Sequence, residues 1–456
     1  MARSIPNSLL IPVETLNREL DGKLLLALLA AARGMRVILG GRQALHHRLP
    51  RLPTSIYLAK GIRTGNRVMF GIAERLGHVI VALDEEALIR FSDEALLLMF
   101  DPVSFNRPRL LYAWGRSNAD LWRRYPGYGG APILEVGNPR VDVLLPRLRG
   151  YWDPEVARLR ARHGRFVLLS SNFSLVNHFI PDHIRFRVAT GAPAERTQAL
   201  RGGIRGHKAV IFEHMKALVP KLAAAIRPAV LVIRPHPSEN ARTWQEVGAG
   251  QENVRVEHEG PIAPWLAAAS ALVHNGCTSG VEAAILGTPA FAYRPVVSPE
   301  FDPELPHAVS VECASADELV EGVVRAVSGA AARGGLRAEP LRALSHHIAS
   351  LDGPLCCERI LDSFSSHRAA LESAPAATAG GRAIGRTHHW LRARVRGVRQ
   401  RRRRSRSSGA YLSHKFPGLE ASQLAARIER FRAVLGPLPE LRARPIHPDV
   451  FAIERA

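Results

Sequence analysis

One stretch of the chain combines residue types that suit binding of a phosphate group. It runs His274-Asn-Gly-Cys-Thr-Ser-Gly-Val-Glu-Ala283 and follows a predicted buried strand. A helix starting near Gly280 would present backbone N–H groups and hydroxyls at its N-terminus, where the helix dipole favours negative charge. The alternative is a plain N-cap by Thr278 or Ser279. The surrounding polar residues and Gly287-Thr-Pro289 favour phosphate binding. Its candidate residues are His274, Asn275, Gly276, Thr278, Ser279, Gly280 and Glu282, with Glu282 in the first turn as an acceptor for a ribose hydroxyl.

A second polar stretch, Arg234-Pro-His-Pro-Ser-Glu239, follows the strand predicted at Ala229 to Ile233. Ligands of open α/β sheets bind beyond the carboxyl ends of the strands, so these side chains are placed to meet one. The prolines stiffen the turn that carries His236, whose imidazole can donate to a phosphate oxygen or protonate a leaving phosphate. A structural histidine is the alternative. Arg234, His236 and Ser238 are therefore candidates.

Three consecutive carboxylates supply acid–base candidates. Leu83-Asp-Glu-Glu86 follows the strand predicted at His78 to Leu83, and mutual repulsion would raise one carboxyl pKa. One carboxylate could deprotonate a hydroxyl or attack an electrophilic carbon. Asp84 would also cap a helix beginning at Glu85, which leaves Glu86 as the more available catalytic residue. Glu14, after the first strand, competes for the role.

Two further turns carry candidate residues. In Gly137-Asn-Pro-Arg-Val-Asp142, Asn138 and Arg140 either contact an acidic ligand or form a tight turn with an Arg140–Asp142 pair. Asn172 and Asn177 follow the strand predicted at Arg165 to Ser170 and are stronger candidates. Ser171 and Asn172 open the first strand–helix turn of the second half of the chain, where a ligand of an α/β sheet would lie.

The elements that position these residues alternate between short apolar strands and helices, which predicts α/β architecture with parallel sheets. We expect two doubly wound, Rossmann-like domains, at residues 1–150 and 151–365, with a linker in Asp142 to Gly164. A basic low-complexity segment at 366–410, expected to be poorly ordered, and a helical extension at 411–456 would follow.

The net charge of +21 is concentrated in that basic segment. Eleven arginines lie between Arg382 and Arg406, and no acidic residue occurs between Glu372 and Glu420. A nucleic-acid-binding protein is disfavoured, since aromatic interleaving is limited to Trp390. Contact with an anionic inner membrane and a solvated linker both fit the segment, and both stay open.

The motifs together resemble the surface carbohydrate biosynthesis family and, more distantly, bacterial Kdo transferases and sialyltransferases. The resemblance covers roughly residues 5–365 and includes Ala113-Trp-Gly115 and Tyr293-Arg-Pro295. It implies a GT-B fold, with two Rossmann-like domains facing a cleft, and a glycosyltransferase acting on a glycan or glycolipid acceptor. It also implies a nucleotide-sugar donor, CMP-linked, with His236 at the CMP phosphate or the cytidine and with Thr278 and Ser279 at the phosphate. The N-terminal domain would then bind the acceptor.

We expect no cofactor and no metal, because one phosphate needs little neutralisation and no Asp-x-Asp flanked by strands occurs. Four cysteines form no disulfide framework, and the chain has no apolar run long enough for a membrane span, which favours the cytoplasm. Two alternatives remain on the same fold: a polyol-phosphate transferase of teichoic-acid type and a nucleotide-sugar epimerase.

Overall fold

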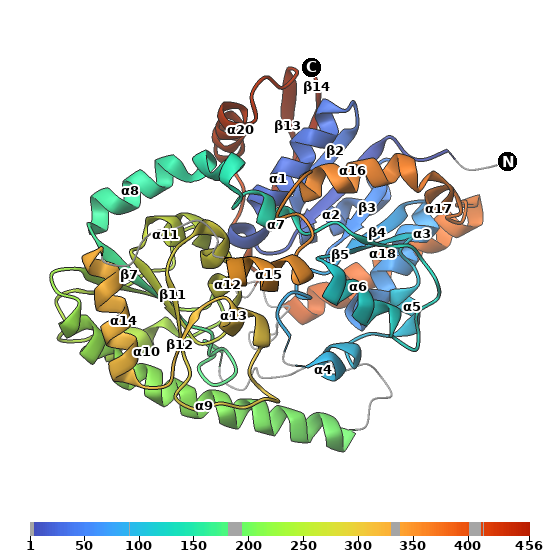
Figure 1. Cartoon of the computed structure of the whole chain (residues 1–456). Helices are drawn as coiled ribbons and strands as arrows, with labels where there is room; N and C mark the ends of the chain where they lie inside the picture. Colours follow the sequence, from blue (N-terminus) through green and yellow to red (C-terminus); the bar gives the residue numbers. More distant parts are fainter. Residues whose placement is uncertain (1–3, 91, 181–193, 330–337, 401–411, 414) are drawn as a thin grey trace. The chain divides into compact units, whose positions relative to one another are not determined.

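The computed structural model describes residues 4–90, 92–180, 194–329, 338–400, 412–413 and 415–456 (Figure 1). The chain forms two compact units. The first comprises Met1–Leu88, Leu97–Val143 and His346–Ala456, and the second Ile89–Leu96 and Leu144–Ser345. The predicted α/β class with two Rossmann-like units is confirmed, because each unit is built around its own largely parallel sheet.

The first unit is built on an eight-stranded sheet in the order β13-β14-β2-β1-β3-β4-β5-β6. Six strands run parallel, and the hairpin β13–β14 joins antiparallel beside β2. Because β2 and β3 flank β1 on opposite sides, the strand order reverses between β1 and β3. The strands are β1 (Ser8–Val13), β2 (Arg36–Gly41), β3 (Ile56–Ala59), β4 (Val79–Leu83), β5 (Leu110–Ala113), β6 (Ile133–Glu135), β13 (Leu441–His447) and β14 (Val450–Arg455).

Helices on both sides bury this sheet. Helix α1 packs on β1, β2 and β14 and also contacts the helices α7, α16 and α20. Helix α3 packs on β4 and also contacts α18. Helix α1 ends before Gly34, whose φ of 84° suits a chain reversal. The helices are α1 (Leu16–Ala32), α2 (Arg42–Arg48), α3 (Arg67–Leu76), α5 (Pro102–Phe105), α6 (Arg116–Arg123), α7 (Pro139–Asp142), α16 (Cys356–Ser366), α17 (Arg368–Glu372), α18 (Ala379–Gln400) and α20 (Ala421–Leu435).

The second unit holds a six-stranded, fully parallel sheet in the order β12-β11-β10-β7-β8-β9. The strand order reverses between β7 and β10, which is where a ligand of an open α/β sheet is expected. The strands are β7 (Phe166–Ser170), β8 (Val230–Arg234), β9 (Val254–Val256), β10 (Ala271–His274), β11 (Ala290–Tyr293) and β12 (Val311–Cys313).

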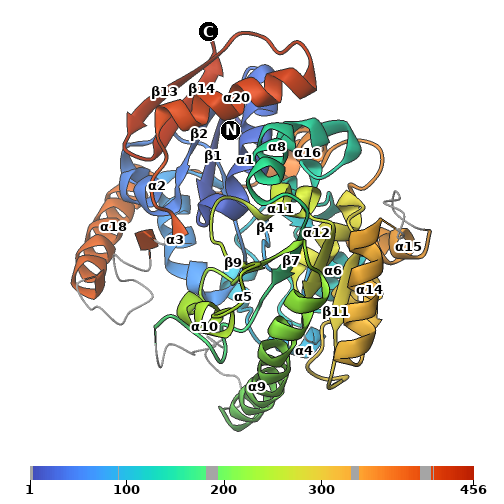
Figure 2. The same ribbon diagram turned by 90° about the vertical axis from the view of Figure 1, so that its left-hand side faces the viewer.

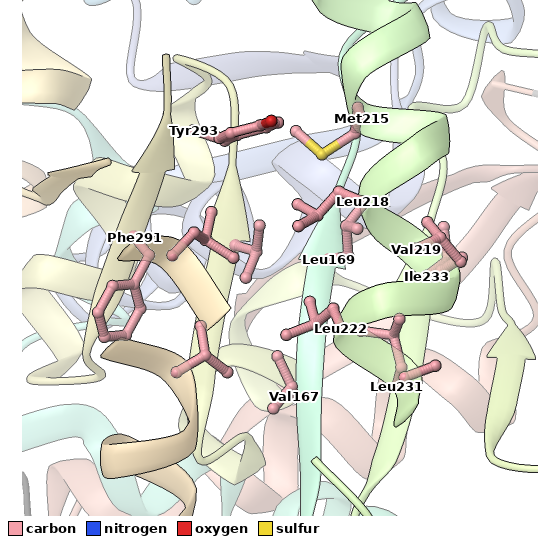
Figure 3. Close-up of a cluster of buried hydrophobic side chains, with 14 of the residues drawn as sticks. Val167, Leu169, Met215, Leu218, Val219, Leu222, Leu231, Ile233, Phe291 and Tyr293 are labelled. Atoms are coloured by element: carbon pink, nitrogen blue, oxygen red, sulfur yellow. The ribbon is translucent and has the colours of Figure 1, made fainter. Parts of the chain in front are cut away.

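One face of this sheet packs on α9 (Ala194–Ala225), α10 (Ala241–Val247) and α14 (Ala316–Ser328) through a buried apolar cluster. Figure 3 shows α9 presenting Met215, Leu218 and Leu222 toward Leu169 and Val167 of β7. Helices α8 (Asp153–His163), α11 (Ile262–Ala268) and α12 (Thr278–Leu286) pack together at the other face; α4 (Asp93–Leu97), α13 (Glu304–Ala308) and α15 (Ala338–His347) complete the list.

The domain boundaries differ from those expected. Residues 346–365 pack with the first unit rather than the second. The expected disorder of 366–410 is wrong for 379–400, which form α18, while 401–411 lie outside the described residues. The extension at 411–456 is not only helical, because its hairpin extends the first sheet. Among the described helices, none combines the length and apolar composition that crossing a membrane requires.

Candidate functional site

The carboxyl edge of the second sheet brings together most of the predicted phosphate-binding residues. Ser170 ends β7 and lies in register between Arg234 of β8 and His274 of β10. Ser279 Oγ donates to Ser170 Oγ at 3.0 Å and also lies 2.6 Å from Cys277 Sγ. These contacts join the start of α12 to the end of β7, at the place where the strand order reverses.

Helix α12 begins two residues earlier than predicted. Its N-cap is Cys277, whose side chain makes no capping hydrogen bond, so the alternative of a plain cap by Thr278 or Ser279 is wrong. The early start also moves Glu282 beyond the first turn, contrary to the prediction. The first N–H groups of a helix lack intrahelical acceptors, so this terminus keeps its affinity for an anion.

His274 is a structural residue rather than a ligand contact. Its ring is fully buried, its Nδ1 accepts from the Gly276 backbone N–H at 3.0 Å, and its Nε2 lies 2.9 Å from Ser310 Oγ. The Ser310 hydroxyl donates to Pro306 O, so the proton of the ring sits on Nε2. Burial, with smaller contributions from His307 and Lys208, lowers the pKa of His274 to about 3. The neutral ring therefore holds the Asn275–Cys277 turn in place.

Two glycines of the motif are required by close packing. Gly276 has a φ of 85°, and a Cβ there would lie 2.8 Å from His307 Nε2. A Cβ on Gly280 would lie 2.6 Å from the His274 ring. Both glycines serve the shape of the turn, and the Gly276 N–H is already used by His274.

Lys208 and Asn275 form the most unusual pair in this region. Lys208 of α9 is 2% exposed, and its Nζ donates to the backbone carbonyl of Asn275 at 3.2 Å. In the described part of the chain no carboxylate forms an ion pair with Lys208, and burial lowers its pKa. The Asn275 side-chain amide is 3% exposed and has no hydrogen-bond partner among the described residues. A buried cation beside a buried, unsatisfied amide is costly unless an anionic, hydrogen-bonding ligand completes them.

Glu239 organises the two loops that follow β7 and β8. Its carboxylate, which is 3% exposed, accepts from Ser171 Oγ at 2.9 Å, Trp244 Nε1 at 2.9 Å, and the backbone N–H groups of Phe173 and His236. Ser171 is thus committed to Glu239 and is not available as a ligand contact. Burial raises the Glu239 pKa, partly offset by these four hydrogen bonds.

His236 lies at the same sheet edge, two residues beyond β8. Its Nδ1 accepts from the Ser238 backbone N–H at 3.1 Å, so the neutral ring carries its proton on Nε2. Arg234, in contrast, binds backbone carbonyls of the same unit. Its guanidinium donates to Glu259 O and Gly260 O and lies 4.7 Å from the Trp265 ring. Burial lowers the Arg234 pKa to about 10. Arg234 is therefore a structural residue.

Asn172 is partly exposed, directly after the β7 edge, and stays a candidate. Asn177, in contrast, is occupied, because its amide donates to Asn240 O and accepts from Thr243 Oγ1.

The first unit gathers charges at the carboxyl edge of its own sheet, again where the strand order reverses. Glu14, after β1, accepts from Arg42 at 2.5 Å, Lys60 at 3.0 Å and Lys415 at 3.0 Å. Burial raises the Glu14 pKa, but these three cations outweigh it and hold it far below its usual value. A carboxylate that is stabilised in this way is a weak base, so Glu14 is no longer a candidate for the general base.

The acidic triplet does not behave as predicted. No helix follows Asp84; its Oδ1 accepts from the Glu86 N–H within a turn. Glu86 pairs with Arg18 at 2.9 Å. Packing raises the Glu86 pKa, but the charges of Arg18 and Lys60 outweigh this and lower it. Burial raises the pKa of Asp84, partly offset by Arg63. Asp84, and not Glu86, is the better proton acceptor.

The Gly137–Asp142 turn is structural. Asn138 is fully buried, caps α7 through Arg140 N, and reaches Glu85 Oε2 at 3.4 Å. The Asp142 carboxylate accepts from Cys356 N and Cys357 N, both at 2.9 Å, at the start of α16. Neither Asn138 nor Asp142 is available to a ligand.

Three important residues were not predicted from the sequence. Glu239 closes the quoted Arg234–Glu239 motif but was not singled out. Lys208 carries no local signal, because its importance comes from burial against a strand–helix turn 67 residues away. Lys60 follows β3, a strand that was not predicted. Within the described residues, no group of three or more His, Cys, Asp or Glu side chains could hold a metal ion.

Comparisons with known proteins found similarity among solved structures alone. No family model and no curated protein matches it. Among solved structures, a variant of the wall teichoic acid polymerase TagF soaked with CDPG is similar over 81% of this chain and 90% of its own, with 11% identity and a TM-score of 0.49. The Methanocaldococcus jannaschii UDP-GlcNAc 2-epimerase, in complex with UDP-GlcNAc and UDP, is similar over 79% of this chain and 99% of its own, with 12% identity and a TM-score of 0.47. Anabaena HepE, in complex with UDP and glucose, is similar over 79% of this chain and 99% of its own, with 12% identity and a TM-score of 0.43. These similarities assign no activity to the chain.

Proposed function

We propose that the protein is a glycosyltransferase of surface polysaccharide synthesis that takes its sugar from a nucleotide-linked donor bound to the second unit. The observation that carries the proposal is the Lys208–Asn275 pair beneath the N-terminus of α12. Within the described residues, the Lys208 ammonium forms no ion pair and the Asn275 amide has no hydrogen-bond partner. Together with the N-terminus of α12, these two buried groups favour the same ligand, a phosphate group.

The donor that this arrangement suits best carries a single phosphate, as a CMP-sugar does. One lysine and one helix terminus supply little positive charge, enough for one phosphate and short of what a diphosphate needs. We therefore also propose that donor binding requires no divalent metal. Thr278, partly exposed in the first turn of α12, adds a hydroxyl at the phosphate.

His236 would act on the phosphate or on the departing nucleotide. With Nδ1 accepting from Ser238 N–H, its Nε2–H is the group that can donate to a phosphate oxygen. Glu239 fixes the loop by accepting from the His236 backbone N–H, so the imidazole is placed by a buried carboxylate. In the first unit, Asp84 is the carboxylate we propose for proton transfer from the acceptor hydroxyl.

Calorimetry in EDTA tests the donor site directly. We expect CMP to bind, UDP to bind more weakly, and Lys208→Met to weaken CMP by about 10- to 100-fold, the value of a hydrogen bond to a charged group. Lys221→Met is the matched control, because Lys221 lies on the same helix and pairs with Asp317 at 2.5 Å on the surface. The control should bind CMP like the parent.

The possible results separate the related activities. Tight UDP binding that depends on manganese would overturn the CMP assignment. Incubation with CMP-sugars, CDP-glycerol and UDP-GlcNAc then distinguishes sugar transfer from polyol-phosphate transfer and from epimerisation. If Lys208→Met and Lys221→Met bind every nucleotide equally well, the phosphate site itself is wrong.

A further inference from the structure

Helix α18 is a cationic helix with two different faces. No acidic residue occurs anywhere between Glu372 and Glu420, and α18 lies within that span. Like charges along one helix repel each other and are not balanced by neighbours at i+4. The helix therefore presents an uncompensated positive charge.

One face of α18 rests on the first unit beside α3, as Figure 2 shows. His389 Nε2 lies 2.8 Å from His46 O, and a Cβ on Gly385 would lie 3.0 Å from Arg75 Cβ. Arg392 and Arg396 follow at positions +3 and +7 from His389, so they share this inner face. Burial lowers the Arg396 pKa to about 10, with Arg392 and Arg42 contributing.

The outer face carries apolar side chains that nothing among the described residues covers. Ile384, Leu391 and Val395 are 50%, 49% and 52% exposed. Their spacing of seven and then four residues places them in one stripe along the helix. Trp390 is also 52% exposed, about 100° around the helix from Leu391, and the guanidinium of Arg394, which lies between these two residues, is 4.5 Å from its ring. An exposed apolar stripe on an arginine-rich helix, with a tryptophan on the adjoining exposed side, is the pattern of a helix that lies in a membrane interface.

We propose that the outer face of α18 is a lipid-binding surface that seats on an anionic bilayer. Ile384, Leu391 and Val395 would enter the interface, while Arg394, which lies three residues after Leu391 and so adjoins the stripe, would contact the headgroups. Charge decides the occupant, because a second copy of this acid-free helix would be repelled, whereas an anionic lipid surface supplies both apolar depth and negative charge. The inference stands whether or not the donor proposal is correct.

Trp390 provides a direct readout. The chain has six tryptophans, and the other five, Trp114, Trp122, Trp152, Trp244 and Trp265, are at most 2% exposed. With phosphatidylcholine vesicles containing phosphatidylglycerol, we expect the emission of the whole protein to shift to the blue and to be quenched by brominated lipid. Pure phosphatidylcholine should give neither effect. Trp390→Phe should abolish the signal while the protein still co-sediments with the anionic vesicles.

Point substitutions are better than deletion of the helix, which would uncover α3. Leu391→Ser and Val395→Ser should each weaken binding to anionic vesicles by roughly tenfold, because each removes apolar surface that would enter the interface. Val297→Ser is the control, since Val297 is 59% exposed in the second unit. It should leave vesicle binding unchanged.

Three results would overturn the proposal. The first is equal vesicle binding by the parent, Leu391→Ser and Val395→Ser. The second is binding without quenching of Trp390. The third is a concentration-dependent dimer of the parent that Leu391→Ser dissolves, which would make the stripe a contact between copies of the chain.

Discussion

Ser171 Oγ donates to Glu239 Oε2 at 2.9 Å, across 68 residues of sequence, and so joins the loop after β7 to the loop after β8. Two backbone N–H groups and Trp244 Nε1 share the same carboxylate. The position of His236 thus depends on a buried acid three residues away that touches no ligand in our proposal.

We expect Glu239→Gln to destabilise the protein by about 1–3 kcal/mol for each donor that the amide leaves unpaired. The amide NH₂ of the glutamine is a hydrogen-bond donor, and it would face donors that the Glu239 carboxylate now accepts from. Denaturant unfolding measures the loss, and nucleotide binding at a temperature where the variant is folded measures the effect on His236. Glu246→Gln is the control and should change neither, because the Glu246 side chain lies on the exposed side of α10. Equal stability of Glu239→Gln and the parent would show that the carboxylate does not organise these loops.

His236→Ala should abolish transfer while the fold persists. Loss of proton transfer lowers turnover typically 10²- to 10⁴-fold. Turnover with purified donor and acceptor measures the loss of transfer, and a thermal unfolding curve shows whether the fold persists. His214→Ala, an exposed histidine on α9, should be fully active. Unchanged turnover in His236→Ala would make this residue structural.

Gly280→Ala and Gly202→Ala should change stability in opposite directions. A Cβ at Gly280 meets the His274 ring at 2.6 Å, and such overpacking costs about 1–3 kcal/mol. Gly202 lies in α9 with nothing within 4 Å of its Cβ, so alanine should stabilise the helix by up to about 1 kcal/mol. Thermal or denaturant unfolding of both variants provides the comparison. A stable Gly280→Ala protein would mean that the turn is looser than described.

Stability should fall in mild acid because of His274. Its folded pKa of about 3 lies below the ordinary 6.5, so as the pH falls the unfolded chain takes up the proton first. The stabilisation is complete above about pH 6.5 and declines toward pH 3. His274→Asn should therefore lose about 1 kcal/mol less than the parent between pH 7 and 5.5, as measured by denaturant titration. His307, with a pKa lowered to about 4 by burial, remains in both proteins. Identical pH slopes would contradict the assignment.

Most strands of both units follow from short apolar runs, and those predicted at His78–Leu83 and Ala229–Ile233 lie within one residue of β4 and β8. Such runs are recognisable because both faces of a parallel strand are buried. Strand β3 was missed because Ile56–Ala59 is short and lies next to charged residues. Strand β13 was missed because its residues on the sheet edge alternate with arginines, whereas β14 begins with an apolar run, Val450 to Ile453, that the predicted helical extension overlooked.

The candidate site was predicted at the level of its loops but not of its side chains. Both motifs do lie at the carboxyl edge of one sheet. Within them, however, Arg234, Ser171 and His274 turned out to hold the loops together. Residue type cannot separate these roles, because a side chain that supports a turn and one that contacts a ligand need the same polar groups. Lys208 could be found only from the fold.

The hairpin β13–β14 has a consequence for synthesis of the chain. Strand β2 is completed on one side by β14, whose residues are made more than 400 positions later. The second unit, in contrast, is built almost wholly from Leu144–Ser345. During translation the second unit can therefore finish folding while the first still has an open strand edge, which is a site for aggregation. The order of folding on the ribosome is then the reverse of the order along the chain, and a premature stop after Ser345 would leave only the second unit able to complete its sheet.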